Sequence, residues 1–248
     1  MNGGTYLISI ITPTYNRKNM LREVIECIRR QTVKDVELII IDDCSTDGTD
    51  EMMREYADLK WIHYVKNEQN MKDPGYSRHK GFLLSKGEFS VFMDDDDFYI
   101  DDRFFEKALT VHSQYGGRLA MVSGNGYNQL EYRNKLRIPT KVGAEGYVDG
   151  REFLLNIGIK YKKPLSTFST VFRRNVLLRA DFEHMDMMND YAIYLRALVY
   201  GDAYILPGYI GVYRLHSTNI SRSIPVNFLL RNMEERVWTR NHLKEMTD

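Results

Sequence analysis

Two apolar runs separated by a helical pattern constrain the fold of this chain more than any other feature. Leu7–Thr12 and Val36–Ile41 are nearly continuous stretches of apolar and β-branched residues, which is typical of strands that are covered on both faces. The segment between them, Asn19–Arg30, carries apolar residues at helical spacing. A strand, a helix and a second strand in such close succession form a parallel, right-handed βαβ unit. The pattern therefore predicts an α/β fold.

The same alternation continues through the first half of the chain and weakens in the second half. Strands are expected at Trp61–Val65 and Phe89–Met93, after helices at Glu51–Asp58 and Gly75–Ser85. The stretch Gly124–Gly150 is predicted to be rich in loops. The other expected helices are Asp102–Gln114, Gly150–Ile157, Arg174–Arg179 and Asn189–Tyr200, and the other strands are Ala120–Ser123, Thr167–Phe172 and Tyr209–Tyr213. We expect one domain, 1–248, with a mostly parallel central sheet flanked by helices.

The overall composition excludes several classes of protein. Lysine plus arginine equals aspartate plus glutamate at 34 each, so no global basic field favours binding to nucleic acid. The two cysteines, Cys27 and Cys44, indicate a reducing compartment rather than a framework of disulfides. The N-terminus lacks a signal-peptide pattern, and no apolar run approaches the roughly 18 residues of a membrane-spanning helix. These observations predict a cytoplasmic protein.

Four consecutive aspartates, Asp94–Asp97, directly follow the fourth predicted strand. Adjacent carboxylates repel one another, so this arrangement is unfavourable unless a hard cation binds there. Asp94 and Asp96 project to the same side of an extended chain and can share a divalent ion. The alternative is an acidic loop that only caps the next helix, although Asp101 and Asp102 could do that without a metal.

Several segments resemble, in the same order, motifs of the family 2 glycosyltransferases, whose nucleotide-binding architecture is called the GT-A fold. The resemblance runs from about Leu7 to Asn219. The acidic run is similar to the metal-binding DXD motif of that family. The other matching segments are Ser9–Arg17, Asp42–Thr49, Ser77–Gly81, Met187–Arg196 and Tyr213–Asn219. The resemblance implies a nucleotide-sugar-binding half at about 1–100 and a smaller acceptor-binding half at about 101–224.

The resemblance also implies which residues bind the nucleotide. Pro13, Tyr15 and Arg17 belong to the segment that lies against the nucleobase and the ribose. Asp43 matches the aspartate that contacts the edge of the base, and Arg78 matches the arginine that approaches the diphosphate.

Elementary chemistry supports part of this assignment. The carboxylate of Asp43 can accept the uracil N3–H, a donor that cytosine lacks, so it favours uridine nucleotides. Tyr15 offers a flat face to a base, and the guanidinium of Arg78 suits a diphosphate. The alternatives are a turn cap at Asp43, loop packing at Tyr15 and a solvated side chain at Arg78. His79 stands where the family commonly has asparagine.

The acidic run and a late histidine complete the implied site for Mg²⁺ or Mn²⁺. Asp96 matches the direct ligand, Asp94 lies beside it, and His216 matches a histidine that can reach the metal or the diphosphate. Asp95 and Asp97 are expected to shape the site, to contact the ribose or sugar, or to cap the next helix. A structural or solvated role is the alternative for His216.

Inverting transfer also needs a general base on the acceptor side. A carboxylate there takes the proton of the attacking hydroxyl while the nucleoside diphosphate leaves on the other face of the sugar. Asp190 matches the residue that serves as this base in the family, and Asn189 replaces the first acid of the family's acidic pair. The alternative is that Asp190 only places a negative charge at the start of a helix.

Taken together, these features predict an inverting glycosyltransferase that uses a UDP-sugar. The expected acceptor is a carbohydrate or glycolipid hydroxyl in the synthesis of surface polysaccharide or lipid-linked glycans. Two rival classes stay open: a sugar-nucleotide nucleotidyltransferase, which would release pyrophosphate, and a non-catalytic protein that binds nucleotide-sugars.

The tail at about 225–248 carries an amphipathic helix pattern. One interpretation is a helix packed on the domain. The other is a helix that contacts a partner or the membrane surface, which would place the enzyme peripherally at the inner face of the cell membrane.

Overall fold

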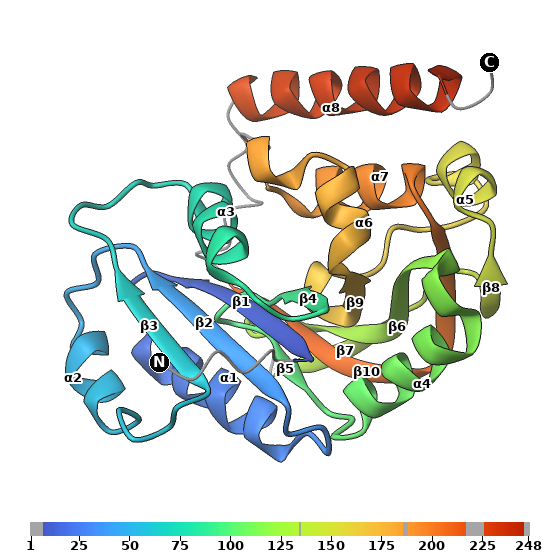
Figure 1. Cartoon of the computed structure of the whole chain (residues 1–248). Coiled ribbons are helices and arrows are strands. Elements are labelled where there is room, and N and C mark those ends of the chain that lie inside the picture. Colours follow the sequence, from blue (N-terminus) through green and yellow to red (C-terminus); the bar gives the residue numbers. More distant parts are fainter. Residues whose placement is uncertain (1–6, 134, 186–187, 217–225, 246–248) are drawn as a thin grey trace.

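The computed structural model describes residues 7–133, 135–185, 188–216 and 226–245. Strands and helices alternate through its first half (Figure 1). These elements are β1 Ile8–Thr14, α1 Lys18–Arg30, β2 Val36–Asp42, α2 Thr49–Arg54, β3 Ile62–Lys66, α3 Pro74–Leu84 and β4 Phe89–Phe92. The second half contains β5 Phe98–Tyr99, α4 Phe104–Tyr115, β6 Leu119–Leu130, β7 Leu136–Thr140, β8 Gly146–Val148, α5 Gly150–Asn156, β9 Thr170–Arg173, α6 Arg174–Arg179, α7 Asp190–Val199, β10 Asp202–Leu215 and α8 Val226–Glu245. Short 3₁₀ turns lie at Gly116–Arg118, Thr167–Ser169 and Phe182–His184.

One central sheet joins both halves of the chain. Its order is β3-β2-β1-β4-β9-β6-β10-β5, with β7 beside β6 and β8 beside β10. The first four strands are parallel, as the βαβ pattern predicts, while β9 runs antiparallel to both β4 and β6. The sheet is therefore parallel where the first half of the chain forms it and mixed where the second half does.

Helices cover both faces of the sheet, which explains why its first strands are apolar along their whole length. Every residue of β1 and β2 is buried. Successive side chains of β1 point to opposite faces. Ile8 and Ile10 belong to the apolar cluster that includes residues of α1, α2 and α4, and Ile11 belongs to the cluster that includes residues of α3, α5, α6 and α7.

The carboxyl ends of β1, β2 and β4 meet at one edge of the sheet, and this edge positions the candidate site. Thr14, the last residue of β1, pairs with Asp42, the last residue of β2. Gly81 lets α3 pack directly on β1, because a Cβ there would lie 2.5 Å from the Cγ2 of Ile11. This close packing holds Arg78, one helical turn earlier, near the same edge.

The prediction that Gly124–Gly150 is rich in loops is wrong. The stretch contains the end of β6 and both β7 and β8. Gly124 and Gly126 resemble turn residues in the sequence, but they lie inside β6 next to β10. A Cβ at Gly124 would lie 2.6 Å from the side chain of Ile210, so glycine marks a close approach here rather than a turn.

The C-terminal helix α8 packs along α7, in agreement with the first interpretation of the tail (Figure 1). Arg196 of α7 forms a buried ion pair with Glu235 of α8, with 2.6 Å between Nε and Oε2. Its guanidinium carbon also lies 4.4 Å from the ring centre of Trp238. None of the helices among the described residues combines the length and the apolarity needed to cross a membrane.

His112 of α4 is a buried histidine that must stay neutral. Its side chain has no exposed surface, and its ring centre lies 4.6 Å from that of Phe89. The ring nitrogen Nε2 donates to the backbone oxygen of Val171 over 3.0 Å. Burial lowers the pKa of His112 to about 4, from 6.5 for an unperturbed histidine.

This shift predicts a loss of stability in mild acid. Above pH 6.5 His112 is neutral in both the folded and the unfolded chain, but between 6.5 and about 4 only the unfolded chain takes up the proton. The folded state should therefore lose on the order of 3 kcal/mol across this window from His112 alone. Urea unfolding of the wild type and of His112→Gln at several pH values measures the effect. Parallel stability curves for the two proteins would contradict it.

Candidate active site

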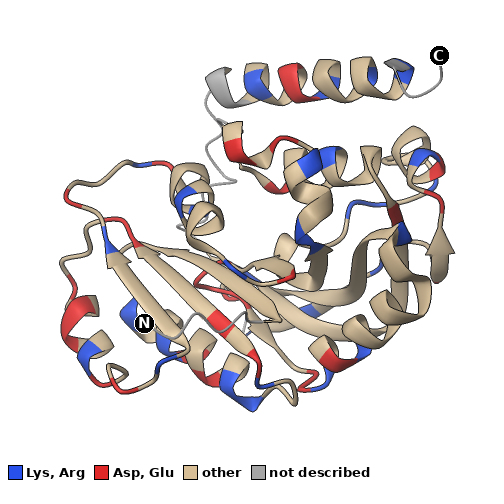
Figure 2. Cartoon of the chain, viewed as in Figure 1, with Lys and Arg blue, Asp and Glu red and all other residues tan. Residues whose placement is uncertain are grey.

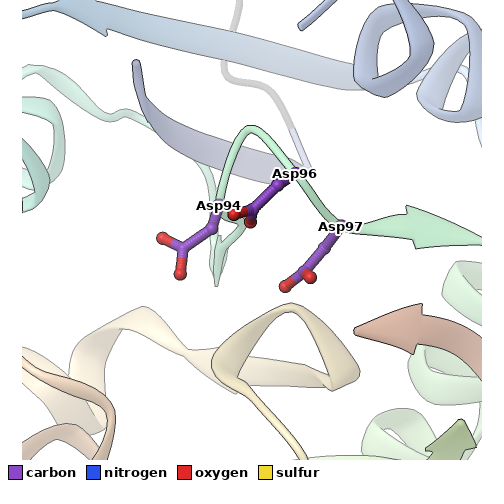
Figure 3. Close-up of side chains that lie close together, drawn as sticks. All are labelled: Asp94, Asp96 and Asp97. Carbon is purple, nitrogen blue, oxygen red and sulfur yellow. The ribbon is translucent and has the colours of Figure 1, made fainter. Parts of the chain in front are cut away.

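The turn between β4 and β5 carries the acidic cluster. Figure 3 shows Asp94, Asp96 and Asp97 leaving this turn with their carboxylates on the same side. One carboxylate oxygen from each of the three lies within 4.8 Å of the others. Hard divalent cations prefer such oxygen ligands, so the three side chains fit Mg²⁺ or Mn²⁺.

Asp97 is the ligand candidate that sequence reasoning missed. Its side chain is 1% exposed, and neither carboxylate oxygen has a hydrogen-bond partner among the described residues. Burial, together with the charges of Asp96 and Asp94, raises the pKa of Asp97 well above its usual value. Burial thus disfavours the charged form of Asp97, and a bound cation would favour it again, so Asp97 supports a metal at this turn. The alternating spacing that singled out Asp94 and Asp96 applies to a strand, whereas these residues form a turn.

Asp95 and Asp96 are both held by Arg17. The Nη1 atom of Arg17 lies 2.8 Å from Asp95 and 2.7 Å from Asp96. The hydroxyl of Thr14 donates to the second oxygen of Asp95 over 2.7 Å, so Asp95 is bound by the protein on both sides. Burial raises the pKa of Asp95 to about 7 even though Arg17 opposes the shift. The Nε2 atom of His216 lies 2.9 Å from Asp96, beside the acidic cluster.

Arg78 connects the acidic cluster to the predicted general base. Its Nη2 atom donates to Asp94 and also lies 3.7 Å from Asp190, while its Nη1 donates to the backbone oxygen of Met188 over 3.1 Å. The side chain is only 8% exposed, so this cation is fixed rather than solvated. Asp94 and Asp190 are far apart in the sequence, but both lie next to the guanidinium group of Arg78.

Asp190 begins α7 but does not cap it. The helix is capped by Asn189, whose Oδ1 accepts from the backbone nitrogen of Ala192 over 3.0 Å. The carboxylate of Asp190 instead lies between Arg78 and the Nζ of Lys163, 3.4 Å away. A quarter of the Asp190 side chain is exposed, so a substrate can reach it. Asn189 therefore supplies the hydrogen-bonding cap, while Asp190 keeps its place as an acid in the first turn of α7, so the alternative of a helix-terminal charge stays open.

Lys163 is a second residue that sequence reasoning missed. It lies in the loop before the 3₁₀ turn Thr167–Ser169, and no motif or periodic pattern distinguishes it from the neighbouring lysines. Burial raises the pKa of Asp190, but Lys163 and then Arg78 outweigh that effect, and the pKa lies below its usual value. Asp190 is therefore ionised at neutral pH.

The predicted base-binding residues lie at the ends of β1 and β2. Tyr15 is 46% exposed, so its ring is free to stack, and Pro13 is buried inside β1. Asp43 accepts from the side chain of Asn67 and from the backbone nitrogens of Met71 and Lys72. These three bonds organise the loop that leads into α3. A carboxylate offers about four acceptor positions, so Asp43 keeps room for one further donor.

The chain is similar to known glycosyltransferases in both sequence and fold. The model of the family described as "Glycosyl transferase family 2" matches residues 9–199. A Campylobacter jejuni protein named GalNAc(5)-diNAcBac-PP-undecaprenol beta-1,3-glucosyltransferase is 36% identical over 91 residues, which cover 36% of this chain and 29% of that protein. The matches cover less than half the length of the first curated relatives.

Two solved structures have the same fold. Staphylococcus aureus TarS in complex with UDP-GlcNAc matches with a TM-score of 0.75 and 20% identity, over 96% of this chain and 71% of that one. The mannosyltransferase PcManGT from Pyrobaculum calidifontis, in complex with GDP-Man and Mn²⁺, matches with a TM-score of 0.59 and 16% identity, over 87% and 59% of the two chains. The expected GT-A fold is confirmed by these likenesses together with the mixed sheet flanked by helices.

The unpaired oxygens of Asp97 predict two opposite effects of one substitution. Asp97→Asn replaces a carboxyl group whose charged form is unfavourable in the folded chain. Without divalent cation the melting temperature should therefore rise by about 2–4 °C for each kcal/mol of destabilisation that the substitution removes. The same change removes a ligand and should weaken Mn²⁺ binding at least about tenfold. Thermal melts in a chelator and in increasing Mn²⁺ measure both effects. Asp58→Asn, a change at an exposed acid, is the matched control. An unchanged response to Mn²⁺ would exclude Asp97 from the ligand set.

Proposed function

Since this chain belongs to glycosyl transferase family 2, we propose that it transfers a sugar from a nucleotide-sugar donor to a hydroxyl group of an acceptor, with inversion at the anomeric carbon. The observation that carries the proposal is the position of Arg78. This buried cation contacts Asp94 of the acidic cluster and lies 3.7 Å from Asp190. If Arg78 binds the diphosphate and Asp190 acts as the base, this contact supports a direct displacement, which requires the two groups to be close together.

On the donor side, Asp94, Asp96 and Asp97 would hold Mg²⁺ or Mn²⁺, with His216 beside them. When bound, such an ion neutralises the charge that develops on the leaving nucleoside diphosphate. Arg78 adds a fixed positive charge at the same place. Arg17 holds Asp95 and Asp96 in position, so the turn keeps its shape while the donor binds and leaves.

On the acceptor side, Asp190 would take the proton of the attacking hydroxyl. Lys163 and Arg78 keep its carboxylate ionised, which is the form that a general base needs. The sugar then passes to the acceptor oxygen as the diphosphate leaves on the opposite face, in one step without a covalent intermediate. Inversion at the anomeric carbon follows from that geometry.

We propose UDP as the nucleotide of the donor. The remaining acceptor position of Asp43 suits the uracil N3–H, and the exposed ring of Tyr15 can stack on the base. One structural neighbour was solved with UDP-GlcNAc and another with GDP-Man, so the fold itself accepts more than one nucleotide.

For the acceptor we propose a hydroxyl of a cell-surface polysaccharide or of a lipid-linked glycan, made on the cytoplasmic side of the membrane. The name of the Campylobacter jejuni relative describes glucosyl transfer to an undecaprenol-linked glycan. The name does not identify the acceptor of this chain, but it supports the class.

A panel of nucleotide-sugars tests the function directly. With Mn²⁺ present, one UDP-sugar should be consumed with release of UDP, and the corresponding GDP- and CDP-sugars should react more slowly. Release of pyrophosphate would instead identify a nucleotidyltransferase, and tight binding without turnover of any donor or acceptor would identify a binding protein.

Asp190→Asn should reduce transfer by about 10²- to 10⁴-fold, because an amide cannot accept the hydroxyl proton. Binding at the donor site, which titration calorimetry with UDP and Mn²⁺ measures, should change little, since Asn189 still caps α7. Asp58→Asn again serves as the control at an exposed site. A variant at Asp190 that keeps wild-type turnover would remove this residue from the mechanism.

Lys163→Met should move the acidic limb of the pH profile of kcat/KM to higher pH. Lys163 is the larger of the two cationic influences that lower the pKa of Asp190, so its loss lets burial raise that pKa. Lys163→Arg keeps the charge and should keep the limb close to that of the wild type. A reduced rate with an unshifted profile in Lys163→Met would assign a purely structural role to this lysine.

A further inference from the structure

A groove separate from the acidic turn lies between α5, α7 and α8. Its volume is about 440 Å³. Its apolar lining consists of Leu154, Leu155, Ile157, Leu195 and Leu243. The polar part of the lining consists of Tyr191, Thr239 and four cationic residues, Arg151, Arg236, Arg240 and Lys244. Among the described residues, no acidic side chain lines the groove. The groove is therefore apolar at its centre and positively charged at its borders.

The outward face of α8 continues this apolar surface. Five apolar side chains recur at helical spacing on the side of α8 that faces away from α7, and each is between 52% and 70% exposed: Val226, Leu229, Leu230, Met233 and Val237. The opposite side of the same helix already packs on the domain through the buried Glu235 and Thr239. Next to the groove, Leu155 is 63% exposed, and Ile159 beyond α5 is 85% exposed. An apolar surface of this extent marks a binding surface, since the fold does not need it for its own core.

The charge at this surface is a local excess. The chain as a whole has equal numbers of basic and acidic residues, 34 of each, yet the groove has four cations and no acid in its lining. Figure 2 shows Lys and Arg at several places along α8 and on α5, with acidic residues on both helices as well. Of the acids, Glu234 of α8 is exposed but does not line the groove. Glu235, one of the acids of α8, is already paired with Arg196.

We propose that α8 and the groove form a docking surface for a lipid bilayer that carries anionic headgroups. The apolar side chains of α8 enter the boundary between headgroups and acyl chains, and the four cations lie at the level of the headgroup phosphates. A symmetric dimer through the same face fits less well. In such a dimer the cationic patch of one copy would face the same patch of the other, and the like charges would repel each other. Tyr191 lines the groove and directly follows Asp190 in the sequence, so the docked surface lies near Asp190. That this is the acceptor side of the site is the one point that rests on the proposed function.

Cosedimentation of the whole chain with vesicles tests the apolar part of the surface. The wild type should bind vesicles of phosphatidylcholine mixed with phosphatidylglycerol, and should bind pure phosphatidylcholine vesicles much more weakly. The combined change Leu229→Ser, Met233→Ser and Val237→Ser should reduce binding at least about tenfold, because exposed apolar area drives insertion. The matched control replaces three exposed apolar residues of the β6–β7 hairpin by serine: Tyr132, Leu136 and Ile138.

A second set of variants tests the cations. Each basic side chain near an anionic surface strengthens binding about fivefold, so Arg236→Gln, Arg240→Gln and Lys244→Gln together should weaken it about 100-fold. Added salt should have the same effect on the wild type. The matched control removes three positive charges around α1, on the other face of the sheet: Arg29→Gln, Arg30→Gln and Lys34→Gln.

Three outcomes would overturn the proposal. Equal binding to neutral and anionic vesicles would remove the role of the cations, and α8 variants that bind like the wild type would remove the role of this surface. A dimer in solution that the apolar α8 variant abolishes, without vesicle binding by the wild type, would assign the surface to a second copy. Turnover of a soluble donor without vesicles is measured on the same proteins, so a failed transferase assay and a failed docking assay remain distinguishable.

Discussion

The balance between a buried run of carboxylates and the few cations that reach it is the constraint on which the rest of the structure depends. Asp95 and Asp97 lie at a strand end that is nearly closed to solvent. Arg17 and Arg78 compensate Asp94, Asp95 and Asp96 through direct contacts, while the oxygens of Asp97 have no hydrogen-bond partner among the described residues. The protein itself therefore leaves the carboxyl of Asp97 uncompensated, and a bound divalent cation would relieve that condition.

The arrangement of the sheet allows this concentration of charge. Parallel strands bring their carboxyl ends to one edge, so Thr14 at the end of β1 reaches Asp95 of the acidic turn without any special loop. The close packing of α3 on β1 at Gly81 then fixes Arg78 against the acids. The second half of the chain adds Asp190 and Lys163 from the opposite side of Arg78. Arg78 and Asp190 are thus held by helices, whereas the acidic turn and Lys163 belong to connecting segments.

Sequence patterns located the chemistry of the site better than its geometry. The apolar strands, the acidic run and the motif around Asp190 are local features, so they could be recognised residue by residue. Strand alternation points to Asp94 and Asp96 and leaves out Asp97, but it does not hold here because these residues form a turn. Lys163 lies in an ordinary basic loop, and only the folded chain brings it to Asp190. The glycines of β6 look like loop residues in the sequence because the neighbours that require them are distant in the chain: Ile210 for Gly124, and Leu165 and Gly211 for Gly126.

The sequence by itself determined the α/β class, the position of the carboxylates at strand ends and the family to which the chain belongs. These properties depend on hydrophobic period and on short motifs, which neighbouring residues carry together. Only the tertiary structure decided which cation meets which acid, that Asn189 rather than Asp190 caps α7, and that α8 buries one side while presenting an apolar face outward. Those outcomes depend on contacts between residues far apart in the chain, and such contacts are set by packing rather than by local pattern.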